Sequence, residues 1–466
     1  MPQLHAGGKR PIARRQCATL AVATLLIAVS CASPAGAALC GDTNGDGFFT
    51  ASDALASLRL AVSSGYDRRG DVVPRAAGAV AEAGDGKVAA GDALEALRAS
   101  VEARIPPCRG ATEKRAAVTT GAYDFSSAGF AVVDLASHAF EYRGGSLNGD
   151  AVIRAPRGIP VVVNRHNYNT LQILDADDAN LATINDCSVS DGFNSNPQDV
   201  LLLSDSKGYV TPYAGGDLLV ISPPVLFEPE LDPACSSIIM DRIDLSAFDS
   251  DGVPEMDQMV AVGSKIYVSI QRLDEGHQPT KGNGAIVVID STTDSVVTSI
   301  PLSFANPFAE TKGLPWDEFQ QRIFVGGPGD IHVLGDGGIE AVDPAGMVSA
   351  GMLMTGADIG ANIFDFVVVG SRRAFAIVAD DDSNSVVDLD IGPAPADRRI
   401  RKTLLSSTAL ITDIEMTQRG ELWVAYRGET KDDPPGLRVF RVTDDAEITT
   451  TPITLGQAPF TLAFIE

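Results

Sequence analysis

The chain has few basic residues and few of the side chains that carry zinc binding or catalysis. It contains 36 lysines and arginines against 61 aspartates and glutamates, which gives a formal net charge of −25, and only 5 histidines and 2 tryptophans. This balance argues against nucleic-acid binding, because a phosphate-binding face must be basic. Paired histidines, a GxSxG sequence and a phosphate-binding loop do not occur in a suitable context, so zinc, serine-nucleophile and nucleotide chemistry are not indicated.

Long helical patterns are nearly absent after residue 105, while 45 glycines and 27 prolines indicate many turns. This composition favours a mainly β body. A chain of 466 residues is also long enough to suggest two folding units rather than one.

Residues 1–37 have the features of a secretory signal peptide. A basic start with Arg14 and Arg15 precedes an apolar run at 18–30 that is too short to span a bilayer, and small residues follow at 35–37. We therefore expect export to the periplasm, the cell surface or the medium, with no transmembrane segment. Two alternatives stay open: Cys31 could be a lipidated N-terminus, and the two arginines could belong to a twin-arginine signal.

The cysteines agree with export. Two of the six lie in the expected signal, and four remain: Cys40, Cys108, Cys187 and Cys235. An even number in an exported chain suggests two disulfides. Because Cys40 and Cys108 bracket a small N-terminal module, we expect Cys40–Cys108 and Cys187–Cys235, with buried free thiols as the alternative.

A calcium-binding loop is predicted at residues 42–53. Oxygen-bearing side chains occupy its positions 1, 3, 5, 9 and 12: Asp42, Asn44, Asp46, Thr50 and Asp53. Gly47 at position 6 permits a sharp turn, and Phe48 at position 7 can offer its backbone carbonyl. Calcium takes about six to eight oxygens, and this spacing wraps them round one Ca²⁺ ion. The alternative is a polar turn without metal.

The loop and the helix expected after it are duplicated. The sequence DALASLRLAV from Asp53 returns as DALEALRASV from Asp92, and the first copy places Leu55, Leu58 and Val62 on one helical face. The second loop has alanine at several ligand positions and keeps Asp85 and Asp92. We expect weak calcium binding there, or none.

This duplicated loop-helix unit, which is EF-hand-like, resembles the type I dockerin family over residues 40–108. The resemblance implies a small α-helical module, here residues 38–108, that binds calcium through the first-loop residues and docks on a cohesin domain of another protein. A contact with the chain's own C-terminal body is the alternative partner. A linker at 109–115 follows the module.

The body at 116–466 is built from a repeated unit. In one copy, Val161 to Ile184, a strand and a loop lead to a second strand that ends at Asp175, and a turn and a third strand follow. Seven copies recur at a period of about 47 to 58 residues, which is typical of propeller blades. Aspartate or serine after a strand suits a turn, because its oxygen can accept a backbone N–H.

Two of the copies contain Tyr209-Val-Thr and Tyr267-Val-Ser. With these motifs the body resembles the YVTN-type family, and the resemblance implies a seven-bladed β-propeller. The segment from Pro459 to Ile465 has no blade after it, and the first copy lacks an innermost strand. We therefore expect this segment to complete the first blade and close the ring, which would remove exposed sheet edges.

Four aspartates stand ten residues before an aromatic residue in their copies: Asp199, Asp257, Asp365 and Asp413. We expect them at equivalent points of innermost strands, facing a central channel. Carboxylates that converge there need a cation or hydrogen-bond donors. Either they hold a divalent cation, with calcium the best candidate, or each accepts backbone N–H groups from the neighbouring blade.

These observations predict an exported calcium-binding protein whose propeller binds a protein or a carbohydrate. Two alternatives stay open. Propellers resembling lactonases, lyases and glycosidases suggest an extracellular enzyme of polysaccharide breakdown, and a structural cell-surface protein would need no ligand. Whether the chain catalyses a reaction is not decided by its sequence.

Overall fold

A computed structural model describes residues 42–43, 45–63, 92–94, 96–97, 113–124, 126–145, 147–190, 194–274, 276–279, 281–308, 313–392, 394–428 and 433–466. All of them belong to one compact unit, residues 33–466. The expected signal peptide, the Cys40–Cys108 pair, Asn44 and Asp85 lie outside the described residues.

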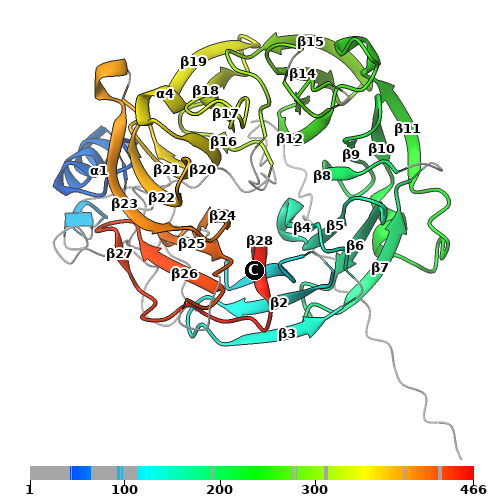
Figure 1. Ribbon diagram of the computed structural model, residues 1–466, viewed down its shortest axis with the longest axis horizontal. Coiled ribbons are helices and arrows are strands. Elements are labelled where there is room, and N and C mark those ends of the chain that lie inside the picture. The colour runs from blue at the N-terminus through cyan, green and yellow to red at the C-terminus, as the bar shows by residue number, and fades with distance from the viewer. Residues whose placement is uncertain are drawn as a thin grey trace, which may run out of the picture. The chain divides into compact units, whose positions relative to one another are not determined.

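The body consists of seven four-stranded antiparallel sheets arranged as blades round a ring (Figure 1). From the innermost strand outward, blade 1 is β28 (Ala458–Ile465), β1 (Arg115–Gly121), β2 (Ala128–Asp134) and β3 (Phe140–Gly144). Blade 2 is β4 (Ala151–Arg154), β5 (Val161–Asn164), β6 (Thr170–Leu174) and β7 (Thr183–Ser188). Blade 3 is β8 (Pro197–Leu202), β9 (Gly208–Pro212), β10 (Asp217–Ile221) and β11 (Ile239–Asp244).

The other four blades follow the same order. Blade 4 is β12 (Met256–Val262), β13 (Lys265–Ile270), β14 (Ala285–Asp290) and β15 (Ser295–Pro301). Blade 5 is β16 (Trp316–Asp317), β17 (Arg322–Gly327), β18 (Gly338–Asp343) and β19 (Val348–Thr355). Blade 6 is β20 (Asn362–Gly370), β21 (Arg373–Ala379), β22 (Asn384–Asp390) and β23 (Arg399–Ser407). Blade 7 is β24 (Ile411–Met416), β25 (Glu421–Tyr426), β26 (Gly436–Arg441) and β27 (Ala446–Glu447).

The inner strands of each blade are apolar because both of their faces are covered by neighbouring blades. In β9 every residue is buried, whereas most of the outermost strand β15 is exposed. The third strand often ends on the expected aspartate: Asp290 accepts the N–H of Thr292 at 2.8 Å, and Asp343 accepts that of Ala345 at 3.1 Å. The repeat seen in the sequence is therefore one blade.

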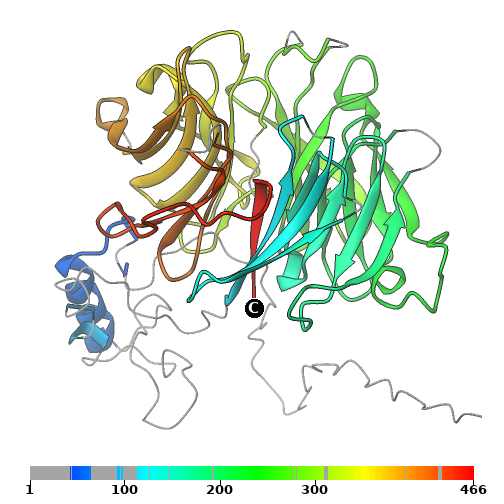
Figure 2. The ribbon, with the colours of Figure 1, turned by 60° about the horizontal axis from the view of Figure 1, so that its bottom comes forward.

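The prediction that the C-terminal segment closes the ring is confirmed. Strand β28 pairs with β1, from Ala458 opposite Gly121 to Ile465 opposite Arg115. Figure 2 shows this C-terminal strand, in red, beside the cyan strands of blade 1. Closure pairs the inner edge of β1 with β28, so β1 is not left as an open sheet edge.

The hydrophobic core lies between blades. The Trp423 cluster joins residues of blades 7 and 1, and the Tyr267 cluster joins blades 4 and 5. Trp423 is completely buried. Tyr209 is also buried, and its hydroxyl donates to Asp294 of the next blade at 2.6 Å. Adjacent blades thus stabilise one another.

Short helices lie in the connections between strands. These helices are η2 (Pro156–Gly158), α3 (Pro223–Phe227), η3 (Ser246–Phe248), α4 (Gly356–Ile359) and η4 (Pro395–Asp397). The predicted Cys187–Cys235 disulfide is confirmed, with a Cα–Cα distance of 5.5 Å. It ties β7 of blade 2 to the segment between α3 and β11 of blade 3.

Helix α1 (Ala51–Ser63) follows the 42–53 loop, as expected. Asp53, Ala54 and Ser57 are buried, whereas Leu55 and Leu58 are exposed. The apolar face noted in the sequence is therefore not the buried face of this helix. The dockerin resemblance of the whole module stays a prediction. Within the described residues, α1 and the other helices are too short or too polar to cross a membrane.

Candidate functional site

Three of the four predicted channel aspartates occupy equivalent positions on innermost strands. Asp199 of β8, Asp365 of β20 and Asp413 of β24 each follow a register shift in the pairing with the second strand. Their Oδ2 atoms accept backbone N–H groups of the next blade: Met259 at 2.8 Å, Ile414 at 3.0 Å and Leu462 at 2.6 Å. Each carboxylate therefore joins two blades.

Asp257 lies one residue away from the equivalent point in blade 4. Val260 pairs with Tyr267 as Leu201 pairs with Tyr209, so the position matching Asp199 is Gln258. The Gln258 N–H donates to Ser269 Oγ at 2.9 Å, just as the Asp199 N–H donates to Thr211 Oγ1 at 3.0 Å. The ten-residue spacing misplaces Asp257 because the two hairpins differ in turn length, 203–207 against 263–264.

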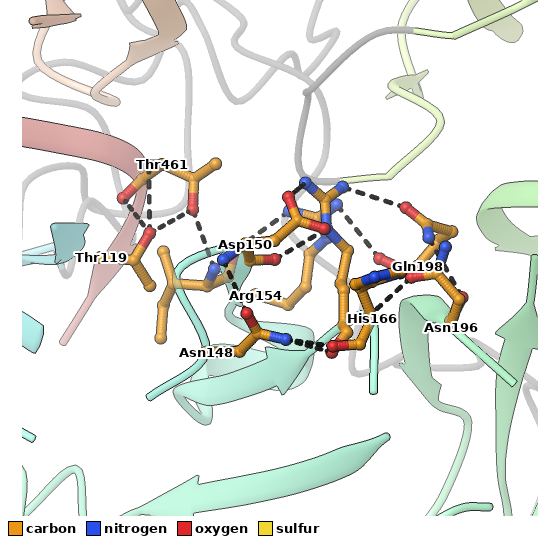
Figure 3. Close-up of polar contacts among 10 residues, drawn as sticks. Thr119, Asn148, Asp150, Arg154, His166, Asn196, Gln198 and Thr461 are labelled. Atoms are coloured by element: carbon orange, nitrogen blue, oxygen red, sulfur yellow. Dashed lines mark hydrogen bonds and ion pairs between the residues drawn. The ribbon is translucent and has the colours of Figure 1, made fainter. Parts of the chain in front are cut away.

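Blade 1 uses a threonine in the same role, which the sequence did not single out. Thr461 Oγ1 accepts the N–H of Ile153 in blade 2 at 2.9 Å and lies 2.9 Å from Thr119 Oγ1 (Figure 3). The Thr461 N–H in turn donates to Thr119 Oγ1 at 3.1 Å. In the sequence, Thr461 stands directly before the apolar Leu462 of an innermost strand, as Asp413 stands before Ile414, and this shared place in the strand is the signal that could have identified it.

Burial governs the acidity of these aspartates. Burial raises the pKa of Asp199 to about 6, although its ion pair with Arg154 and the hydrogen bond from Met259 oppose the shift. Burial also raises the pKa of Asp365 and of Asp413 well above the ordinary value, and the charges of Glu415 and of the partner aspartate add to the rise in Asp413. Asp365 and Asp413 therefore hold a proton at pH values where an exposed aspartate has lost it.

A polar network surrounds the start of blade 2 (Figure 3). Arg165 is buried and donates to Asp150 Oδ1 at 2.5 Å and to Gln198 Oε1 at 3.0 Å. Arg154, also buried, pairs with Asp199 at 3.2 Å. The two guanidinium groups are thus engaged by carboxylates and amides of blades 2 and 3.

His166 enters this network through its backbone. Its N–H donates to Asn196 Oδ1 at 2.9 Å, and its carbonyl accepts from Asn148 Nδ2 (Figure 3). The turn is built from left-handed residues, including Asn167 and Asn169. The side-chain amides of asparagine complete the hydrogen bonds that such a turn leaves open. This arrangement orders the loop.

The predicted calcium loop has a defined hydrogen-bond frame. Asp42 Oδ1 accepts the N–H of Gly45 at 2.7 Å, and Asp42 Oδ2 accepts that of Gly47 at 2.8 Å. The Thr50 N–H donates to Asp53 Oδ2 at 2.8 Å. Asp42 and Asp53 are buried, so oxygen atoms of the first and last loop positions are directed into the turn.

A hard cation such as Ca²⁺ prefers oxygen ligands. Asp42, Asp46, Thr50, Asp53 and the Phe48 carbonyl would hold it. Across the part of the chain that the structure describes, however, His, Cys, Asp and Glu side chains do not gather in threes at metal-holding distance. The three loop carboxylates are therefore not drawn round one point. Asp92, at the matching end of the second loop, is buried.

Comparison with known proteins identifies the fold and no more. No known family model matches the chain, and no curated protein matches it in sequence. A crystal structure of a Lactobacillus plantarum protein is similar with a TM-score of 0.50 at 10% identity, covering 76% of this chain and 100% of that one. At this identity the likeness supports a shared propeller fold alone.

Two other solved structures are less similar. A Bacteroides fragilis protein proposed to be a 6-phosphogluconolactonase has a TM-score of 0.49 at 10% identity, covering 77% of this chain and 99% of that one. Hydrazine synthase of Kuenenia stuttgartiensis has a TM-score of 0.43 at 12% identity, covering 63% and 76%. The chain has the architecture of a seven-bladed β-propeller.

Proposed function

We propose that the chain is an exported calcium-binding protein whose propeller acts as a binding scaffold. The proposal places one Ca²⁺ ion in the 42–53 loop. The observation that carries it is the Asp42 carboxylate, which is buried and accepts the N–H groups of Gly45, Asp46 and Gly47. These bonds close the turn at residues 42–47, and the loop sequence carries oxygen ligands at the alternating positions that calcium loops require.

The role of scaffold is supported by the use of the inner aspartates. Asp199, Asp365 and Asp413 bond the backbone of neighbouring blades, so these carboxylates already have a structural task. The loops of the propeller face would bind a protein or a carbohydrate. The N-terminal module would bind a cohesin-like domain or the chain's own propeller.

Export is supported by the Cys187–Cys235 disulfide. Both cysteines are buried and the bridge ties two blades together. Structural disulfides of this kind persist in oxidising compartments and are rare in the reducing cytosol. The disulfide therefore agrees with the expected signal peptide at residues 1–37.

Calorimetric titration of the intact chain with calcium tests the proposal. The wild type should bind one equivalent, because the second loop has lost most of its oxygen ligands. Asp46→Ala removes the ligand at position 5 of the first loop and should abolish binding. Asp85→Ala removes the matching position of the second loop and should leave it unchanged. Absence of binding by the wild type, or equal binding by the Asp46 variant, would refute the proposal.

A further inference from the structure

The 42–53 loop lies against the turn between β20 and β21 of blade 6. The Gly45 carbonyl accepts two hydrogen bonds from Ser371, one from its N–H at 3.0 Å and one from its hydroxyl at 3.0 Å. Both partners are described parts of one compact unit. The loop is therefore fixed to the propeller through its own backbone.

Two glycines allow this close approach. A Cβ on Gly370 would lie 2.3 Å from the backbone nitrogen of Gly47, a distance that real atoms do not reach. A Cβ on Gly47 would lie 2.8 Å from Arg373 Cβ, and Gly47 also has a left-handed φ of 86°. Gly47 thus meets two demands at once, the sharp turn of the loop and the contact with the blade.

The next residue, Phe48, places its ring against two arginines. Arg401 Cζ lies 4.4 Å from the ring centroid, and Arg373 Cζ lies 5.2 Å from it. Guanidinium groups at such distances are attracted to the electron-rich face of an aromatic ring. We call Gly370, Ser371, Arg373 and Arg401 the Phe48 seat.

The seat is rigid because Arg373 is held from both sides of a blade boundary. Its side chain is 4% exposed and pairs with Asp388 of blade 6 at 3.1 Å and with Asp445 of blade 7 at 2.6 Å. It also donates to the Val442 carbonyl at 2.7 Å. A ring that packs on Arg373 therefore contacts a network that joins two blades.

We infer that cation binding by the 42–53 loop and docking of Phe48 in its seat favour one another. The inference rests on the proposed calcium function. Phe48 would give its carbonyl to the ion while its ring contacts the seat, and Gly47 serves both contacts. Docking holds the loop in a turn that the ion would otherwise have to order, so the docked loop binds calcium more tightly. By linkage, calcium strengthens docking by the same factor.

Calcium titration of four intact chains tests the coupling. Phe48→Ala removes the ring but keeps the backbone carbonyl. Arg401→Ala changes the seat and leaves the sequence of the 42–53 loop intact. Each should weaken calcium binding by about five- to tenfold, the range expected for loss of a partly exposed cation–π contact. Phe49→Ala, the matched control at the neighbouring position outside the seat, should change affinity less than twofold.

Hydrogen exchange gives a second readout, on the blade side of the contact. The Ser371 amide donates to Gly45 across the contact, so calcium should slow its exchange in the wild type and have little effect in Phe48→Ala. Equal calcium affinities in all four chains would overturn the coupling and leave calcium binding intact. No binding by the wild type would overturn the proposed function itself. If Phe48→Ala does not fold, Arg401→Ala carries the test.

Discussion

The inner aspartates illustrate how position decides the task of a carboxylate. From the sequence, four acids on innermost strands suggested either a shared cation or bonds between blades. Three of them, Asp199, Asp365 and Asp413, accept backbone N–H groups from the next blade. A buried carboxylate is costly unless it is hydrogen-bonded, and here the bonds also fix the angle between adjacent sheets.

A pH dependence follows from Asp199. Its pKa rises from 3.8 in the unfolded chain to about 6 in the fold, so the folded state binds the extra proton between these values. Its contribution to stability is complete below about pH 3.8 and is lost as the pH rises through 6. Asp199→Asn should therefore make the unfolding free energy less dependent on pH in this window, by up to about 1.4 kcal/mol per pH unit.

Urea unfolding at pH 4, 5, 6 and 7 measures this slope. Asp205→Asn is the matched control, because the Asp205 side chain is 94% exposed on the same blade. The control should retain the wild-type slope. An Asp199 variant that also retained it would show that this carboxyl titrates at its ordinary value in the fold.

At the residue scale, the sequence predicted hydrogen bonds between blades as one of two roles for the inner aspartates, but it did not identify every residue that makes such a bond. The aspartate spacing identified Asp199, Asp365 and Asp413, since it reflects the pairing of the first two strands of a blade. It failed at Asp257, because a change of turn length shifts the register and places Gln258 at the equivalent point. It also missed Thr461, whose short hydroxyl makes the same bond in a different chemical form.

At the scale of elements, the closing strand holds the two ends of the propeller together. Thr461 of β28 bonds Ile153 of blade 2 and Thr119 of β1. Thr461→Val keeps the shape but leaves the Ile153 N–H and the Thr119 hydroxyl without this oxygen. We expect unfolding to become easier by about 1–3 kcal/mol, the cost of an unsatisfied buried polar group.

Chemical denaturation of Thr461→Val and of Thr450→Val, a substitution at an exposed threonine, tests this expectation. The exposed variant should lie within about 0.5 kcal/mol of the wild type. If both variants were equally stable, the hydroxyl bonds at the ring closure would contribute nothing measurable.

The disulfide between blades 2 and 3 is a second tie between elements. It closes a sequence separation of 48 residues, and both cysteines are buried. Replacing Cys187 and Cys235 together by alanine should lower the free energy of unfolding by about 2–4 kcal/mol, mainly through the greater freedom of the unfolded chain. Urea unfolding in the absence of reductant measures it. A reductant should destabilise the wild type more than the double variant, which keeps only the predicted Cys40–Cys108 bridge.

The elements themselves were the most predictable part of the molecule. Strand, turn and strand recur along the chain, and the lone C-terminal segment implied that β28 completes blade 1, which the pairing with β1 confirms. These features depend on local pattern and on a simple count of strands. Helix α1 was expected from the same kind of pattern, but its buried face is formed by small residues such as Ala54 and Ser57 rather than by Leu55 and Leu58.

At the scale of the whole molecule, the contact between the N-terminal loop and blade 6 joins residues far apart in the chain. Phe48 meets Arg373 and Arg401 more than 300 residues later. A single sequence carries no signal for such a contact, because each residue is already explained by its own neighbourhood. Phe48 offers a loop carbonyl, Arg373 stands at one end of a strand, and Arg401 lies in an outermost strand. The fold shows the Phe48 ring against blade 6, and the backbone carbonyl of the same residue is the group proposed to bind the cation.

Anomalous X-ray scattering from crystals grown with calcium, or with a lanthanide in its place, tests the central claim most directly. The account predicts a peak in the 42–53 loop, surrounded by Asp42, Asp46 and Asp53, with Asp199, Asp365 and Asp413 still bonded to neighbouring blades. A loop without a peak, or a peak between the inner aspartates at the channel, would contradict it.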